Sequence, residues 1–376
     1  METITGPAHI QKVTGELSYL APESTVLRRF TAPGESVNTG TYRAYDMPIR
    51  DGRPVSDQFT LDRNGFAIVG HTSAVQDFTD REEVERVYPG EVAEFVRSAT
   101  GADRVAPLGW VLRRSADPGE NASQPQAALV HCDFSVTGAR GRAEAAYAAR
   151  FPDGPGFRRA LLTSVWRVFS PPPQDWPLAL CDYQSVGPGE GLDNRLYFVD
   201  KIPADLYAEM PADAPGTSGF EFHHNPAHQW WYFPDMTRDE ILFFKFNDSD
   251  HSRAWRVPHS AFRDTTAEAT EPRHSIEFRV AAYFELLPME LERQAWNDEG
   301  REEERDEPLA GAPEGDHVVV GGIEGHGSAR VPATADLERM PSGFDWRLER
   351  LVHFNRSDTF TIDEDIVGGA TNLHPD

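Results

Sequence analysis

Lysine is nearly absent from this 376-residue sequence, which contains only Lys12, Lys201 and Lys245. Acidic residues are abundant by comparison, and 61 Asp and Glu against 36 Lys and Arg give a formal net charge of −25. Nucleic-acid phosphates require a basic surface, and anionic membranes attract basic segments. We therefore expect neither nucleic acid nor a membrane among the partners of this protein.

Cysteine and long apolar segments are scarce as well. Cys132 and Cys181 allow at most one disulfide, which excludes a disulfide framework. No run approaches the ~20 apolar residues that span a bilayer, and the first residues lack the apolar segment of a secretion signal. With 39% hydrophobic residues, we expect a globular cytoplasmic enzyme.

Several familiar catalytic motifs are missing. The sequence has no Gly-x-Ser-x-Gly nucleophile motif, no Walker A or Gly-x-Gly-x-x-Gly phosphate loop after a strand, and no Cys-x-x-Cys pair for structural zinc. These absences direct attention to histidine, carboxylate and arginine patterns.

Hydrophobic patterning predicts a mainly β protein. Short β-branched and aromatic runs separated by turn residues fill positions 160–284, as in a sandwich or barrel. Helical spacing predicts a helix within 77–101, with Gly101 as its C-cap, and a second helix over 138–151. Residues 1–75 indicate an irregular, partly β region.

We divide the chain into three segments of one integrated domain. Residues 1–105 are expected to form an irregular and helical layer, and residues 106–290 a jelly-roll catalytic core. Residues 291–376 contain an acidic loop at 297–308 and a β-containing C-terminal extension, and a candidate helix at 288–296 spans the boundary between the second and third segments.

The segment His131-Cys132-Asp133 contains the first candidate site. The spacing alone is weak, because His374-Pro375-Asp376 repeats it at the C-terminus. On a strand, His131 and Asp133 would project from one face, and they would supply two ligands of a 2-His-1-carboxylate metal site. Candidates for the third ligand are His223, His224, His228, His251, His259 and His274.

His259 is the best of these candidates, because the elements after it also fit. Arg273-His274-Ser275 follows, and double-stranded β-helix oxygenases place an Arg-x-Ser after the distal histidine to bind 2-oxoglutarate. A guanidinium binds a carboxylate with two hydrogen bonds, and a hydroxyl adds another donor. Arg273 and Ser275 would share a strand face.

Larger blocks extend this pattern. "VHCDFS", "SVWRVFSPPPQDWPLALCDYQS", "HQWWYFPDMTRDEILFFKFNDSD", "VPHSAF" and "RHSIEFR" occur in order within residues 40–285. In these blocks the sequence resembles the CmcJ/NvfI (AsaB-type, GA4 desaturase-like) family of oxygenases.

The resemblance implies a double-stranded β-helix fold and oxidation of a small specialised metabolite with Fe(II), 2-oxoglutarate and O2. It implies His131, Asp133 and His259 as iron ligands, and Arg273 and Ser275 at the co-substrate. Succinate and CO2 would be the co-products, and hydroxylation or desaturation would be the outcome. Family analogy also suggests a homodimer.

Several alternatives remain open at this stage. Arg279 shares a face with Arg273 and is the alternative carboxylate binder. Arg167 would contact 2-oxoglutarate or substrate, or it would form an ion pair with Asp182 on a neighbouring strand. His224 or His228 would line the mouth of the site. The rival functions are a cupin-type metal enzyme that does not use 2-oxoglutarate and a non-catalytic partner subunit.

Overall fold

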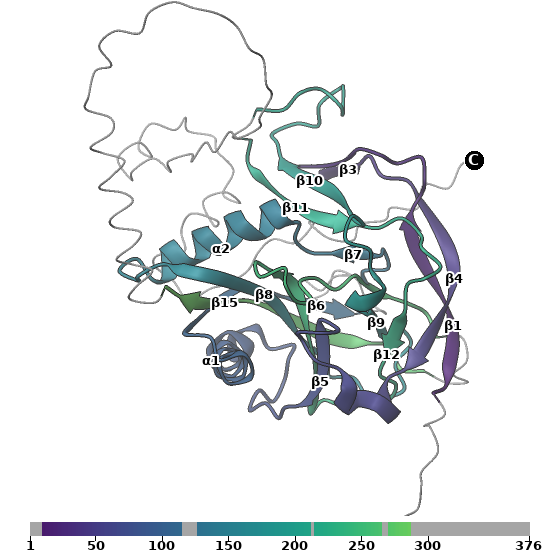
Figure 1. Ribbon diagram of the computed structural model, residues 1–376, viewed down its shortest axis with the longest axis vertical. Helices are drawn as coiled ribbons and strands as arrows, with labels where there is room; N and C mark the ends of the chain where they lie inside the picture. Colours follow the sequence, from purple (N-terminus) through teal and green to yellow (C-terminus); the bar gives the residue numbers. More distant parts are fainter. Residues whose placement is uncertain (1–9, 115–125, 212–213, 265–269, 287–376) are drawn as a thin grey trace, which may run out of the picture. The chain divides into compact units, whose positions relative to one another are not determined.

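The computed structural model describes residues 10–114, 126–211, 214–264 and 270–286. Within these ranges the chain is mainly β, with two sheets and two α-helices (Figure 1). The predicted helix at 288–296, the acidic loop, the C-terminal extension and His374-Pro375-Asp376 all lie outside the described residues. No helix in the described ranges is long and apolar enough to cross a bilayer.

The larger sheet contains the short strands that hold the candidate metal ligands. Its hydrogen-bonded order is β1 (Lys12–Leu20), β4 (Tyr42–Asp51), β12 (Trp230–Tyr232), β9 (Leu178–Cys181), β14 (His259–Ala261), β7 (His131–Cys132), β11 (Gly216–Glu221), β10 (Leu192–Phe198), β2 (Leu27–Ala32) and β3 (Glu35–Asn38). Strand β7 therefore lies between β14 and β11, and it pairs antiparallel with both.

The smaller sheet has the order β5 (Phe66–Gly70), β13 (Glu240–Asp248), β8 (Phe157–Val168), β15 (His274–Glu285) and β6 (Arg104–Arg114). One core contains residues of both sheets, including Leu180 of β9 and Phe244 of β13, so the two sheets face each other across it. We call this side of the smaller sheet its inner face.

Helix α1 (Arg81–Thr100) covers the opposite, outer face of the smaller sheet (Figure 1). The Asp80 side chain accepts a hydrogen bond from Glu83 N, and Gly101 ends the helix in the left-handed conformation at φ 69°, as N- and C-caps commonly do. The helix and the Gly101 cap predicted from sequence are confirmed. Two short 3-10 helices, η1 (Arg53–Gln58) and η3 (Tyr183–Ser185), lie in connecting segments.

Helix α2 (Val136–Arg150) begins three residues after Asp133 and confirms the second predicted helix. Ser135 caps it by accepting a hydrogen bond from Gly138 N at 3.2 Å. Ser135 Oγ also lies 2.5 Å from Ser218 Oγ on β11. The start of α2 thus fixes the chain just beyond Asp133 to the neighbouring strand.

The N-terminal region is more regular than its sequence indicates. Strands β1 and β4 form an antiparallel pair at one end of the larger sheet, and β2 pairs parallel with β10. Strand β5 pairs with β13 in the smaller sheet. The segment is therefore part of both sheets, and the expected irregular layer over 1–105 is corrected in this respect. The domain boundaries themselves stay a prediction.

Gly219 on β11 allows close approach of the backbone that follows β7. A Cβ at this position would lie 2.9 Å from the carbonyl oxygen of Cys132 and 3.0 Å from that of Asp133. We predict that Gly219→Ala lowers the free energy of unfolding by about 1–3 kcal/mol, as overpacking does. Denaturant unfolding measures this change. Gly70→Ala is the control, because nothing lies within 4 Å of its Cβ position, and equal losses in both variants would contradict the prediction.

Candidate metal centre and co-substrate site

His131, Asp133 and His259 converge on one point. Their ligand atoms lie within 4.8 Å of one another. His131 and His259 are direct cross-strand partners on β7 and β14, and their Nε2 atoms each lie 3.4 Å from Asp133 Oδ1. The predicted grouping of these three side chains is therefore present in the structure. The side chains are almost fully buried, between 4% and 9% exposed.

The backbone fixes which nitrogen of each imidazole faces this point. His131 Nδ1 lies 2.7 Å from the carbonyl oxygen of Leu129, and His259 Nδ1 lies 3.0 Å from that of Val257. A carbonyl only accepts, so each Nδ1 must carry the proton and donate it. Each neutral ring then presents the unprotonated Nε2 to the centre, as a metal-binding histidine does.

Three acceptors facing one another without a cation repel. Within the described part of the chain, neither oxygen of Asp133 has a well-aligned hydrogen-bond donor, although both are buried, and two imidazole lone pairs face the same carboxylate. A divalent cation bound by nitrogen and oxygen ligands would remove this repulsion. The donor set therefore fits a metal of the Fe(II) class.

Charged side chains behind Asp133 balance its buried charge. Arg279 Nε lies 2.9 Å from Asp133 Oδ2 and 3.1 Å from Glu277 Oε1, and Arg113 Nε is 3.9 Å from Glu277 Oε2. Burial alone would raise the pKa of Asp133, but the Arg279 guanidinium holds that pKa well below its usual range. Asp133 is thus an anion before any metal binds.

Arg273 is a buried cation of a different kind. Its guanidinium donates to the carbonyl oxygen of Trp176 and, at 3.0 Å, to Gln126 Oε1, which are both neutral acceptors. Its Nε has no partner, and no carboxylate of the described residues forms an ion pair with it. Burial, with nearby Arg113, lowers the pKa of Arg273 to about 9.

Ser275 accompanies Arg273 on the inner face. Ser275 Oγ is buried and has no hydrogen-bond partner among the described residues, and the Arg273 guanidinium carbon lies 5.4 Å from the ring centre of inner-face Trp166. A buried guanidinium with unused donors beside an unused hydroxyl is suited to a carboxylate ligand. The pair thus fits one carboxylate of a keto diacid.

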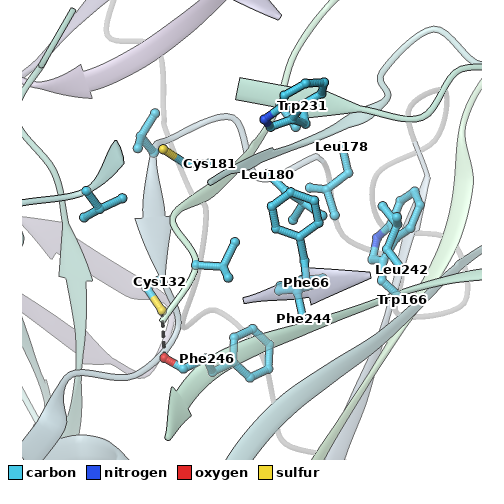
Figure 2. Close-up of a cluster of buried hydrophobic side chains, with 14 of the residues drawn as sticks. Phe66, Cys132, Trp166, Leu178, Leu180, Cys181, Trp231, Leu242, Phe244 and Phe246 are labelled. Carbon is cyan, nitrogen blue, oxygen red and sulfur yellow. Dashed lines mark hydrogen bonds between the residues drawn. The ribbon is translucent and has the colours of Figure 1, made fainter. Parts of the chain in front are cut away.

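The inner face divides into a charged half and an apolar half. The register places Ser275, Glu277 and Arg279 of β15 opposite Val168, Trp166 and Ser164 of β8. Beyond them, Phe244 pairs with Phe66 and Leu242 with Ile68. Figure 2 shows Trp166, Leu242, Phe244 and Phe66 grouped with Leu178, Leu180 and Trp231 of the larger sheet.

Arg167 requires a correction. It pairs with Ile276 in the register and therefore points to the outer face, one residue out of step with Trp166. Its guanidinium contacts Tyr88 OH at 3.1 Å and the carbonyl oxygen of His71 at 2.8 Å, while Asp182 accepts from Asn64. Neither contact with 2-oxoglutarate nor pairing with Asp182 fits this position.

The remaining candidate histidines lie elsewhere. His228 is bonded to Tyr19 and Glu190, and His224 stacks on Tyr45. His223, His251 and His274 contact Leu20, Trp255 and Phe169, respectively. Sequence reasoning missed Glu277 and Arg113, although the alternation Arg273, Ser275, Glu277, Arg279 in an otherwise apolar strand was a usable signal.

Comparisons with known proteins identify relatives with an oxidative function. A family described as "Oxidoreductase/YMDC permease-like domain" matches residues 17–283. Hydroxylase/desaturase CTB9 of Cercospora beticola is 31% identical over 265 residues, covering 65% of this chain and 78% of the relative. The Fe(II)/2-oxoglutarate-dependent dioxygenase nvfI of Aspergillus novofumigatus is 26% identical over 259 residues, covering 67% of this chain and 87% of the relative. This chain belongs to the CmcJ/NvfI-type family of Fe(II)/2-oxoglutarate-dependent oxygenases.

The solved structures agree with the fold of this oxygenase. The structure of the iron and alpha-ketoglutarate-dependent endoperoxidase NvfI superposes with a TM-score of 0.60 at 23% identity, covering 74% of this chain and 99% of that chain. The mainly β architecture predicted from the sequence is confirmed.

We predict that metal binding by the oxygenase weakens as pH falls. Burial opposes protonation of His131, but Asp133 outweighs it and raises the pKa of His131 above its ordinary value. A proton therefore competes with the metal, and affinity for Mn(II) should fall by about tenfold per pH unit below that raised pKa. Calorimetry in buffers of different ionisation enthalpy would detect the released proton. An affinity that stays constant between about pH 8 and about pH 6 would contradict the prediction.

Proposed function

We propose that His131, Asp133 and His259 hold the Fe(II) of this oxygenase. The observation that carries the proposal is the convergence of three buried acceptors with both Nδ1 atoms committed to backbone carbonyls. When bound, Fe(II) with 2-oxoglutarate and O2 supplies the oxidising chemistry and yields succinate and CO2. Three protein ligands leave positions for the co-substrate and O2.

Arg273 and Ser275 are assigned to the far carboxylate of 2-oxoglutarate. Arg273 lacks a carboxylate partner among the described residues and retains unused donors, and Ser275 Oγ has no partner. Arg279 is assigned a different role from the one considered at the sequence level. Its ion pair with Asp133 orients that carboxylate, so Arg279 positions a ligand and does not bind the co-substrate.

The strand arrangement supports a double-stranded β-helix for the core. The His-x-Asp element lies at β7, the distal histidine on adjacent β14, and the Arg-x-Ser element at the start of β15 in the facing sheet. This arrangement puts the metal ligands on one sheet and the co-substrate residues on the other.

The substrate we propose is a small, largely apolar metabolite that contains rings. The aromatic half of the inner face, with Phe66, Phe244 and Trp166, and Trp231 of the larger sheet support this class, since apolar pockets with few polar groups bind such molecules. Relatives named hydroxylase/desaturase favour hydroxylation or desaturation as the outcome. A homodimer and a cytoplasmic location stay predictions.

Binding of 2-oxoglutarate tests the assigned residues. Addition of 2-oxoglutarate to the anaerobic Fe(II) protein should produce a weak visible charge-transfer band, which His131→Ala and His259→Ala should abolish. Arg273→Ala should weaken 2-oxoglutarate binding by about 2–5 kcal/mol, which is about thirtyfold or more. Ser275→Ala should weaken it by only about 1 kcal/mol.

Arg167→Lys is the matched control for the Arg273 variant. Because its guanidinium lies on the outer face, the substitution should leave the dissociation constant of 2-oxoglutarate unchanged. Bound iron without a band would support the cupin-type rival, and loss of 2-oxoglutarate binding in Arg167→Lys alone would overturn the assignment of Arg273.

A further inference from the structure

Tyr19 forms a buried hydrogen-bonded pair with His228, away from the metal centre. The Tyr19 side chain on β1 is fully buried. Its hydroxyl oxygen accepts a hydrogen bond from Trp230 Nε1 at 2.8 Å and lies 3.0 Å from His228 Nδ1. The mechanism proposed above uses none of these three side chains.

A carboxylate behind His228 sets the direction of these hydrogen bonds. His228 Nε2 lies 2.7 Å from Glu190 Oε2, and Asn225 donates to the other oxygen of Glu190. Burial alone would raise the pKa of Glu190, but His228 and Asn225 lower it, so the carboxylate is an anion and accepts from Nε2–H. His228 Nδ1 is then an acceptor, and the Tyr19 hydroxyl donates to it. Glu190 is 30% exposed, which connects this chain of hydrogen bonds to solvent.

Two adjacent tryptophans of β12 face the pair on one side of the larger sheet and the apolar cluster near His259 on the other. His259 pairs with Leu180, and Leu180 pairs with Trp231, on three adjacent strands of the larger sheet. Trp231 lies in the apolar cluster beside Leu180 (Figure 2). Trp230 is the preceding residue on β12 and points to the other face of the sheet, where it donates to Tyr19.

A second tyrosine continues from Tyr19 toward the surface. The ring of Tyr45 lies 5.9 Å from that of Tyr19, and it stacks on His224 at 3.9 Å. Tyr45 is only partly buried. The series Trp231, Trp230, Tyr19 and Tyr45 therefore leads from the core side of the larger sheet to a position that solvent reaches.

We propose that Tyr19 and His228 are a redox-active pair that removes oxidising equivalents from the metal centre when 2-oxoglutarate is consumed without productive substrate. Iron held by the proposed ligands and left oxidised would accept one electron, together with a proton from solvent, and Trp231, Trp230 and finally Tyr19 would supply that electron in turn. The Tyr19 O–H bond breaks, its proton moves to His228 Nδ1, and a neutral tyrosyl radical remains. An external one-electron reductant such as ascorbate then returns the electron to Tyr19, His228 returns the proton, and a second equivalent of the reductant returns the iron to Fe(II).

The partner of the hydroxyl distinguishes Tyr19 from an ordinary buried tyrosine. Tyr283 is equally buried, but its hydroxyl donates to the carbonyl oxygen of Ala143 at 2.9 Å. A carbonyl satisfies the hydrogen bond but does not take up the proton, whereas an imidazole backed by a carboxylate does both. Tyr283→Phe is therefore the matched control.

The inference rests on the proposed function, so its test measures both. Iron-loaded protein is mixed with 2-oxoglutarate and O2 without substrate, frozen rapidly, and examined by electron paramagnetic resonance while succinate is quantified. We expect a tyrosyl signal in the unaltered protein and in Tyr283→Phe, and its loss in Tyr19→Phe. Tyr19→Phe should also accumulate oxygen-modified Trp231, detected by peptide mass spectrometry. Succinate without the signal would overturn the redox pair, and absence of succinate would overturn the proposed function.

Flash-quench oxidation of the metal-free protein by a ruthenium tris-bipyridyl complex tests the pair independently of iron. The tyrosyl signal should disappear in Tyr19→Phe and persist in Tyr283→Phe. His228→Gln keeps a hydrogen-bonding side chain but removes the proton acceptor, so the signal should be lost while the melting temperature shows that the fold is retained. A signal that survives in folded His228→Gln would show that the contact is only structural and would overturn the proposal.

Discussion

The pairing of β7 with β14 is the constraint on which the site depends. His131 and His259 lie far apart in sequence but opposite each other in the sheet, and this one register brings two imidazoles to the same point. A shift of one residue would turn either histidine to the other face. Strand β7 contains only two residues, so its position depends on β11 and on the Ser135 cap of α2. The close approach at Gly219 belongs to the same arrangement.

The charged side chains on and beside β15 are arranged around the buried carboxylate of Asp133. Asp133 is a buried anion, and a buried charge is strongly unfavourable without a partner. Arg279 balances Asp133, while Glu277 lies between Arg279 and Arg113. Arg273 is the exception, because its partners among the described residues are neutral. The charges near Asp133 are thus balanced, whereas Arg273 at the other end of the row is available to an anion, as a site for an anionic co-substrate requires.

Sequence patterns predicted most of the site but less of the fold. Strand alternation and the order of the motifs were sufficient to select His131, Asp133 and His259 as a group, and the structure brings these three side chains together. The sequence did not predict the face of the sheet to which Arg167 points. Strand β8 has apolar residues on both faces, so its pattern does not show which residues point inward. The register with β15 determines this. Strands β1, β3 and β11 were missed because they contain polar residues or glycines and are strands through tertiary pairing.

Strand β12 lies between the apolar cluster near His259 and the hydrogen-bonded pair of Tyr19 and His228. Trp231 faces the apolar cluster near His259, and Trp230, one residue earlier, faces Tyr19 on the opposite side. The two indoles are covalent neighbours, although the backbone of the sheet separates their environments. An oxidation that reaches Trp231 is therefore adjacent to a hydrogen-bonded tyrosine with its own proton acceptor. The same alternation that gathers the proposed iron ligands on one face of the sheet thus places Trp230 and its hydrogen-bonded tyrosine on the opposite face.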